Sequence, residues 1–152
     1  MIKYVKEDTS VCFAEIREEI SLGLNISRCP HRCLGCHSQY LQTNIGDELT
    51  IEIIESLIEK NKGITCVLFM GGDNDKETLK EFGTFVKSKN LKSAWYSGET
   101  ELDLNEYGKY FDYIKVGPYI ESLGPLNVKT TNQRLYQISN DTIEDITYTF
   151  WR

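Results

Sequence analysis

The sequence predicts an α/β protein built on a mostly parallel sheet. Apolar segments with strand character alternate with amphipathic segments of helical period between about residues 50 and 116. The segment TCVLFM at 65–70 is apolar almost throughout, which is typical of a strand buried on both faces. The chain has 152 residues, which fits one domain, whereas a complete eight-fold barrel needs roughly 200 residues or more. We therefore expect a single domain over residues 1–152 that forms a partial, open (β/α) barrel.

The N-terminal part is predicted to form a β hairpin at about residues 10–28. One candidate strand covers 11–16. In the second, Leu22, Leu24 and Ile26 alternate with small or polar residues, which is the period of a strand. This second strand leads directly into a cluster of cysteines, so we expect a cysteine-rich loop just beyond a strand end.

The core of the fold is predicted at about residues 22–118. A helix over 50–60 follows Thr50, which suits the N-cap position. A second helix over 75–89 starts with Asn74 and Glu77, which are spaced like a capping box. A shorter helix is expected over 102–111, and further strands over 65–70, 91–96 and 113–116. This alternation indicates parallel strands joined by right-handed crossovers.

The pattern changes after Gly117 and Pro118. Residues 119–138 are rich in Asn, Gly, Pro and Thr, which predicts loops and turns. The tail at about 147–151 fits either a last strand or a packed extension. We expect the whole segment 119–152 to be rich in loops.

Charge and hydropathy exclude several classes of function. The net charge is −6, with acidic and basic residues mixed along the chain. Because phosphate binding needs a basic patch, this argues against nucleic acid as a partner. No run reaches the ~18 apolar residues of a membrane helix, and the N-terminus lacks the apolar core of a signal peptide. We expect a cytoplasmic protein that binds neither nucleic acid nor membranes.

Five cysteines are present, and three of them lie within CPHRCLGCHS, residues 29–38. Such clustering, with an odd total, argues against a secreted disulfide framework and favours metal binding or redox chemistry. The other two, Cys12 and Cys66, lie in apolar strand patterns and are predicted to be buried, unreactive thiols. One metal cluster is therefore expected.

Three interpretations of the C-x₃-C-x₂-C spacing stay open at this point. In a 4Fe–4S cluster, three thiolates would hold three irons and leave the fourth iron open to another ligand. A zinc ion would take the three thiolates together with His31 or His37, although all four ligands would then crowd into one loop. A redox-active pair of Cys33 and Cys36 is the third interpretation.

The cysteine motif, on a loop after the first barrel strand, resembles the signature of the radical S-adenosylmethionine (SAM) enzymes. Within this superfamily, CPHRCLGCHS is similar to the activating proteins of anaerobic ribonucleoside-triphosphate reductase. Two more stretches carry the same resemblance, GGD at 71–73 and GPYIESLGPLNVKTTNQRLY at 117–136. The resemblance spans roughly residues 22–138. The resemblance to the superfamily rests on the cysteine motif, and the resemblance to the subfamily rests on GPY…TNQR.

The resemblance implies a radical SAM fold with one 4Fe–4S cluster and SAM as cofactors. Cys29, Cys33 and Cys36 would ligate three irons, and the fourth iron would chelate the amino and carboxylate groups of SAM. An electron from the reduced cluster would then cleave the S–C5′ bond, giving methionine and a 5′-deoxyadenosyl radical. No catalytic residue is expected beyond the cluster and SAM.

Residues that would bind SAM lie in two places. The resemblance places the adenine near the backbone of Gly35, Cys36 and His37. Gly71 and Gly72 end a buried strand, where ligands of α/β proteins bind.

Free carbonyl groups at this strand end would accept hydrogen bonds from the SAM ammonium, and glycine lets a ligand approach the backbone closely. Asp73 would add a charge-assisted hydrogen bond through its short side chain.

Two further residues have open alternatives. Ser97 ends the third strand and would either reach the SAM ribose or carboxylate or be a solvated turn residue. Lys115 would either face the barrel and meet a carboxylate, or lie between sheet and helices with its tip exposed.

The stretch at 132–134 would belong to the active-site region or to a partner contact, where Arg134 suits a bidentate clamp on a carboxylate.

The resemblance implies an activating enzyme that generates a glycyl radical on anaerobic ribonucleoside-triphosphate reductase. Its partners would be that reductase and an electron donor such as reduced flavodoxin or ferredoxin. A chain too short to close its barrel suits a loop of a protein partner, because a small substrate needs walls that bury most of it. The alternatives are a radical SAM enzyme acting on a small molecule and a zinc-binding interaction module.

Overall fold

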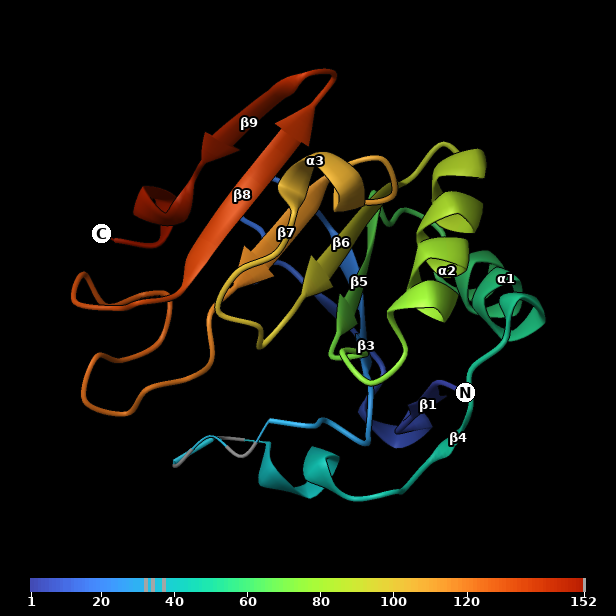
Figure 1. Ribbon diagram of the computed structural model, residues 1–152. Helices are drawn as coiled ribbons and strands as arrows, with labels where there is room; N and C mark the ends of the chain where they lie inside the picture. Colours follow the sequence, from blue (N-terminus) through green and yellow to red (C-terminus); the bar gives the residue numbers. More distant parts are fainter. Residues whose placement is uncertain (32, 34, 37, 152) are drawn as a thin grey trace.

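A seven-stranded sheet runs through the computed structural model, which describes residues 1–31, 33, 35–36 and 38–151 (Figure 1). The strand order is β2-β3-β5-β6-β7-β8-β9. The central strands β3, β5, β6 and β7 are parallel, whereas β2, β8 and β9 add antiparallel strands at the two sides. The bounds are β2 Ser10–Cys12, β3 Ser21–Asn25, β5 Cys66–Met70, β6 Lys92–Tyr96, β7 Tyr113–Val116, β8 Arg134–Ser139 and β9 Thr142–Asp145. The predicted α/β class with a largely parallel sheet is confirmed.

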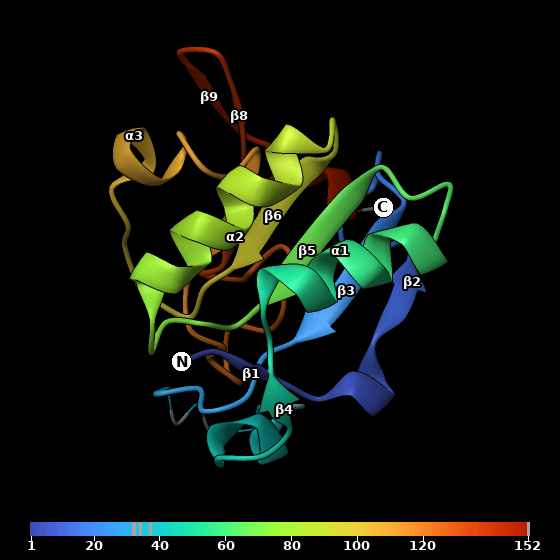
Figure 2. The ribbon, with the colours of Figure 1, turned by 90° about the vertical axis from the view of Figure 1, so that its right-hand side faces the viewer.

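Two α-helices cover one face of this sheet (Figure 2). They are α1 Ile51–Lys60 and α2 Lys76–Ser88, and a single-turn helix, α3 Leu104–Tyr107, follows β6. Apolar side chains of the strands and of both long helices form the larger core. Its members include Leu24, Ile54, Val67, Phe69, Leu79, Phe82, Trp95 and Ile114. The helices cover this face of the sheet, so a site can form on the opposite face.

The helix-free face is covered by irregular segments instead. Ile16 from the β2–β3 connection and Phe150 from the 3₁₀ helix Thr147–Phe150 pack on Leu68, Ala94 and neighbouring strand residues. Further 3₁₀ helices span Lys6–Asp8 and Gln39–Gln42. Because these covers are short, part of this face stays uncovered toward the carboxyl ends of the parallel strands, where two of the cavities described below lie.

The two cysteines outside the loop behave largely as predicted. Cys66 is fully buried in the core of the helix-free face, and Cys12 is half-buried in β2. Burial raises the pKa of each thiol to about 12. Both thiols are therefore protonated at neutral pH and poor metal ligands.

A second, two-stranded sheet pairs the N-terminus with the segment that follows the cysteines. Strand β1 Lys3–Tyr4 lies antiparallel to β4 Asp47–Glu48. Ser27, at the start of the cysteine loop, donates its backbone N–H to the Lys3 carbonyl at 2.9 Å and its hydroxyl to the Ile45 carbonyl at 2.6 Å. The N-terminal segment thus supports the base of the cysteine loop.

Several predicted elements need correction in the first two thirds of the chain. The strand expected over 11–16 is limited to Ser10–Cys12. The helix expected over 102–111 is only α3, because the Asp103 side chain caps its start and the Gly108 N–H closes its end on the Leu104 carbonyl at 2.9 Å. The N-cap of α2 is Asp75 rather than Asn74, whereas Thr50 caps α1 as predicted.

The loop-rich prediction for 119–138 is wrong from Arg134 onward. Strand β8 pairs antiparallel with β7, and β9 returns beside it as a hairpin. The tail at 147–150 is a packed 3₁₀ helix, not a last strand. The turn signal was present in the sequence, since Asn140 adopts a positive φ of 53° between the two strands, a conformation that Asn tolerates better than most residues.

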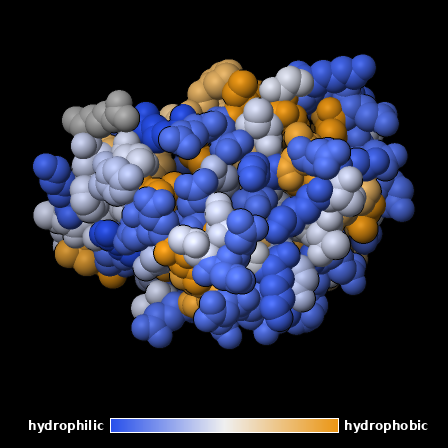
Figure 3. Space-filling model, turned by 90° about the horizontal axis from the view of Figure 1, so that it is seen from above, coloured by the Kyte–Doolittle hydropathy of each residue, from blue (hydrophilic) through white to orange (hydrophobic). Residues whose placement is uncertain are grey.

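The molecular surface at the amino ends of the parallel strands is mainly hydrophilic. Figure 3 views this end of the molecule, with apolar residues scattered among polar ones. Within the described part of the chain, the helices are too short or too polar to cross a bilayer. The surface at this end therefore gives no indication of a docking site.

Replacing Asp75 with Ala should destabilise the protein by about 1 kcal/mol, because the helix loses its N-cap. The Asp75 carboxylate accepts hydrogen bonds from the Thr78 N–H at 3.3 Å and from the Thr78 hydroxyl at 2.7 Å, and it pairs with the N-terminal ammonium at 2.7 Å. Asn74→Ala is the matched control and should stay within about 0.5 kcal/mol of wild type. Chemical denaturation measures both, and equal losses would show that Asp75 is not the cap.

Candidate metal centre and cofactor cavity

The cysteine loop begins directly after β3. Its entry is fixed by backbone hydrogen bonds, from the Arg28 N–H to the Thr43 carbonyl at 3.0 Å and from the Cys29 N–H to the Leu41 carbonyl at 2.8 Å. Arg28 itself adopts a positive φ of 59°, which turns the chain away from the sheet. Inside the loop, the Cys36 N–H donates to the Cys33 carbonyl at 3.2 Å.

The three cysteines of the loop share one cavity. Cys29, Cys33 and Cys36 are half-buried free thiols, and all three line a cavity of ≈ 330 Å³ at the carboxyl ends of the parallel strands. Burial raises the pKa of the Cys29 thiol, and the nearby Asp73 carboxylate acts in the same direction, against a hydrogen bond from the His31 backbone. Since metals bind thiolates, metal uptake at Cys29 would release a proton, and the affinity for the metal would rise with pH.

Most of the residues predicted to bind SAM lie in this same cavity. Gly71, Asp73, Ser97 and Lys115 line it beside the cysteines. Gly72 does not line it, because a Cβ there would point at the Leu79 side chain, 2.5 Å from Cδ1. Substitution of Gly72 would therefore disturb the packing of α2 before it met any ligand.

Two predicted contacts on the cysteine loop have different outcomes. A Cβ at Gly35 would lie 2.6 Å from the Glu121 carboxylate, so the loop at 118–131 reaches over the cysteine loop at this glycine. Gly35 is not among the residues that line the cavity. His37 lies outside the described residues, and its predicted place near the adenine stays a prediction.

The carbonyl groups at the end of β5 are not free, contrary to expectation. The Gly71 carbonyl accepts the Trp95 indole N–H at 2.9 Å, and the Gly72 carbonyl accepts the Asp75 N–H at 3.0 Å. Each carbonyl oxygen has a second lone pair, so a ligand ammonium would share these acceptors with groups of the protein. The indole bond also holds the end of β5 against β6.

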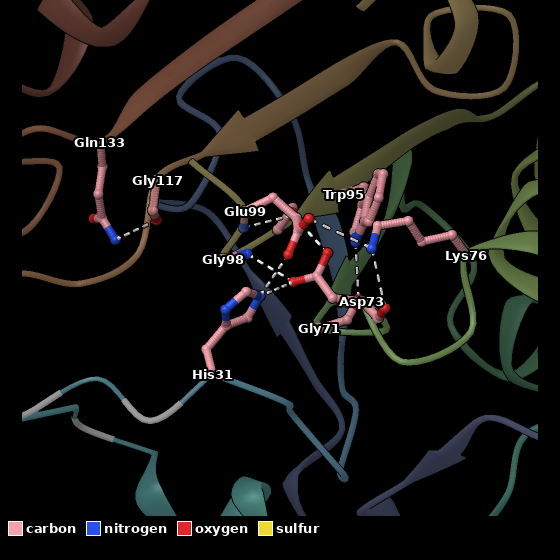
Figure 4. Close-up of polar contacts among 10 residues, drawn as sticks. His31, Gly71, Asp73, Lys76, Trp95, Gly98, Glu99, Gly117 and Gln133 are labelled. Carbon is pink, nitrogen blue, oxygen red and sulfur yellow. Dashed lines mark hydrogen bonds and ion pairs between the residues drawn. The ribbon is translucent and has the colours of Figure 1, made fainter. Parts of the chain in front are cut away.

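Asp73 makes several side-chain hydrogen bonds at the cavity (Figure 4). Its side chain is 2 % exposed. Oδ1 accepts the Ser97 hydroxyl at 2.6 Å, while Oδ2 accepts the Gly98 N–H at 2.8 Å and the His31 imidazole Nε2 at 2.9 Å. A carboxylate offers about four acceptor positions, so three bonds leave one for a ligand. Asp73 can therefore organise the cavity wall and still meet a cation.

The His31 ring lies between two carboxylates. Besides Asp73, its Nε2 is 3.2 Å from Oε1 of Glu99, whose other oxygen is 3.7 Å from the Lys76 ammonium. Both neighbours of Nε2 are acceptors when ionised, so this nitrogen carries the proton and donates it. Sequence reasoning missed this contact, because 42 residues separate His31 from Asp73 along the chain.

Ser97 is not the solvated turn residue that was one of its two alternatives. It is fully buried, with 0 % of its surface exposed. Its hydroxyl donates to Asp73 and accepts the Glu99 N–H at 3.0 Å. The hydroxyl thus orients Asp73, and a contact with SAM stays a prediction.

Lys115 faces the cavity rather than the helices. Its neighbours Ile114 and Val116 pack in the core beneath the helices, so Lys115 points to the other face, in register with Tyr96 on β6. Its ammonium lies over the Tyr96 ring, 5.1 Å from the centroid. Among the described residues we find no hydrogen bond or ion pair to this ammonium. Burial lowers the pKa of Lys115 to about 8, although Asp73 and the cysteines act in the opposite direction.

The stretch at 132–134 is bound within the protein. Asn132 donates its amide to the Pro118 carbonyl at 3.1 Å, and Gln133 donates to the Gly117 carbonyl at 3.2 Å. Arg134 does clamp a carboxylate with two nitrogens, but that carboxylate is Asp145 of the same chain, at 2.8 and 2.7 Å. Gln133 alone of the three lines the cavity. These residues hold the Gly117 turn and the β8–β9 hairpin in place.

Lys115→Met should stabilise the metal-free protein by about 1 kcal/mol, because it removes a poorly solvated charge while keeping the volume. Between the folded pKa of about 8 and the reference value of 10.5, the unfolded chain binds more protons. The wild type therefore gains stability as pH rises through this window, and the advantage of the variant should shrink. Urea denaturation at pH 7 and pH 10 tests this. A variant that is less stable than wild type at pH 7 would contradict it.

Comparison with known proteins agrees with this arrangement. A family model described as a 4Fe-4S single cluster domain matches residues 19–139, which include the cysteine loop and all the cavity residues. No curated protein and no solved structure gives a significant match. Since the match covers most of the chain, this protein belongs to the family of 4Fe-4S single cluster domains.

Proposed function

We propose that this protein is a cytoplasmic radical SAM activating enzyme with a partial, open barrel. It would use one 4Fe–4S cluster and SAM to generate a glycyl radical on anaerobic ribonucleoside-triphosphate reductase, with reduced flavodoxin, ferredoxin or a similar protein as electron donor. The observation that carries the proposal is the shared cavity. Three free thiols, the buried Asp73 and the Lys115 ammonium line it together.

The donor set fits a 4Fe–4S cluster with one open iron. Three cysteines supply three thiolates, and each iron of such a cluster normally takes one. A zinc ion would need a fourth ligand besides the three thiolates. The family match favours iron–sulfur over zinc.

The charges in the cavity suit the amino-acid part of SAM. Lys115, which has no hydrogen bond or ion pair among the described residues, presents a cation for the carboxylate, and Asp73 keeps one acceptor position for the ammonium. Gly71 lines the same wall. With SAM on the open iron, such a cluster, once reduced by the electron donor, would supply the electron that breaks the S–C5′ bond, giving methionine and a 5′-deoxyadenosyl radical.

The remaining walls would keep water from this reaction. Leu41, Met70, Tyr96 and Pro125 contribute apolar surface to the cavity. The Tyr96 hydroxyl donates to the Glu15 carbonyl, which fixes the ring beneath the Lys115 ammonium. An apolar wall limits the access of water to a reactive intermediate and so reduces side reactions.

A second cavity gives a route for the partner. It has a volume of ≈ 480 Å³ and shares five lining residues with the first, Met70, Tyr96, Lys115, Pro125 and Gln133. Its outer wall includes Ala14 and Asn127, which are both exposed. A segment of the reductase that enters here would approach the proposed SAM site from the helix-free face, and its glycine must come within about 3–4 Å of the 5′ carbon.

Each of Cys29→Ala, Cys33→Ala and Cys36→Ala should abolish cluster binding, whereas Cys66→Ala should cost only packing, about 1–2 kcal/mol. Anaerobically reconstituted wild type and Cys66→Ala should both hold about four irons per chain, measured by iron and sulfide analysis. A wild-type protein that takes up zinc but never iron would remove the proposal.

Anaerobic incubation of the reductase with this protein, SAM and dithionite should produce a glycyl doublet in electron paramagnetic resonance. Cys33→Ala should give none. Ala14→Trp should block the second cavity and reduce the doublet, while SAM cleavage without the reductase continues. Ser122→Trp is the matched control, since Ser122 is also small and exposed but lines a different cavity.

The possible results distinguish the entry route of the partner from the activase function itself. If only Ser122→Trp lowers the doublet, the partner enters elsewhere. If wild type forms no doublet but consumes a small molecule and releases 5′-deoxyadenosine, the small-molecule alternative replaces the activase.

A further inference from the structure

His31 connects the cysteine loop to the sheet through its side chain. Within the loop, the described residues are 29–31, 33 and 35–36, and of these only His31 has a side-chain hydrogen bond to the strand ends. At the base of the loop, the backbone bonds of Arg28 and Cys29 lead to the segment 41–43, and Ser27 bonds to the carbonyls of Lys3 and Ile45, so none of these bonds reaches the seven-stranded sheet. His31 therefore sets how the loop lies against β5 and β6.

We propose that His31 is a positioning residue that holds the iron–sulfur ligands in a fixed place relative to Asp73. His31 lies two residues from Cys29 and two from Cys33, so fixing its ring limits the movement of both thiols. The cluster part of this inference rests on the family of the chain, and its SAM part rests on the proposed function.

Gly98 provides the space for the imidazole. A Cβ at this glycine would lie 2.6 Å from Cδ2 and 3.0 Å from Cγ of His31, closer than side chains pack. Gly98 is outside the positive-φ region, so its backbone accepts alanine without strain. Its N–H also donates to Asp73 at 2.8 Å. Gly98→Ala is therefore expected to act mainly by displacing the His31 ring.

The hydrogen bonds around Asp73 couple the two halves of the cavity. The carboxylate accepts from Ser97, Gly98 and His31 at once, so a shift of the cysteine loop changes the acceptor that faces the cavity. A bound cluster and a cation at Asp73 would then favour the same loop position. By linkage, each strengthens the binding of the other, and removal of the ring should weaken both.

The test is a double-mutant cycle with His31→Ala, Gly98→Ala and the combined variant, each reconstituted anaerobically. Three quantities are measured: the midpoint potential of the cluster, its lifetime in air, and the SAM dissociation constant. His31→Ala should shift the potential, shorten the lifetime and weaken SAM binding by about tenfold, as losses of residues behind metal ligands do. Gly98→Ala should change the same three quantities in the same direction as His31→Ala does.

The combined variant should be no worse than His31→Ala, because the added methyl group then meets no ring. His31→Gln, which keeps a donor for Asp73, should recover part of the loss. If His31→Ala retains no cluster, the same three quantities are compared among wild type, Gly98→Ala and His31→Gln.

Two results would overturn the inference. One is an unchanged potential, lifetime and SAM affinity in His31→Ala. The other is that Gly98→Ala changes the potential, the lifetime and the SAM affinity as much in the His31→Ala background as in wild type. Should wild type hold a cluster but bind no SAM, the proposed function fails, while the potential and the lifetime still decide the role of His31.

Discussion

The buried carboxylate of Asp73 joins three parts of the chain that the backbone alone does not connect. It follows β5, accepts from Ser97 and Gly98 beyond β6, and accepts from His31 in the cysteine loop. A charge with a 2 % exposed side chain is tolerable only when hydrogen bonds replace the lost water. The polar groups around it are therefore constrained to converge, and the shape of the cavity depends on that convergence.

The cavity exists because the two faces of the sheet are covered differently. Helices α1 and α2 bury the back of the parallel strands, so their carboxyl ends need no further cover there. On the other face the cover is short, and a row of paired residues, Asn25, Met70, Tyr96 and Lys115, runs across four strands. This row forms part of the cavity wall. A cation in it is destabilising unless a ligand pairs with it, which is the usual conflict between stability and binding.

Much of this arrangement could be predicted from periodicity and from the strand ends. The parallel strands and both long helices follow from the alternating apolar patterns, and Gly71, Asp73, Ser97 and Lys115 meet because parallel strands end at one edge. The partner of His31 could not be predicted, since it depends on the path of an irregular loop. The β8–β9 hairpin was missed because its strands carry many polar residues, such as Arg134 and Gln137, which resemble a loop in composition.

The central claim is that three cysteines hold a cluster whose open iron shares a cavity with Asp73 and Lys115. The most direct test is electron paramagnetic resonance of the reduced cluster with and without SAM. The account predicts a signal of about one spin per chain whose g-values change when SAM binds the open iron. A spectrum that saturating SAM leaves unchanged, in protein with about four irons per chain, would contradict it.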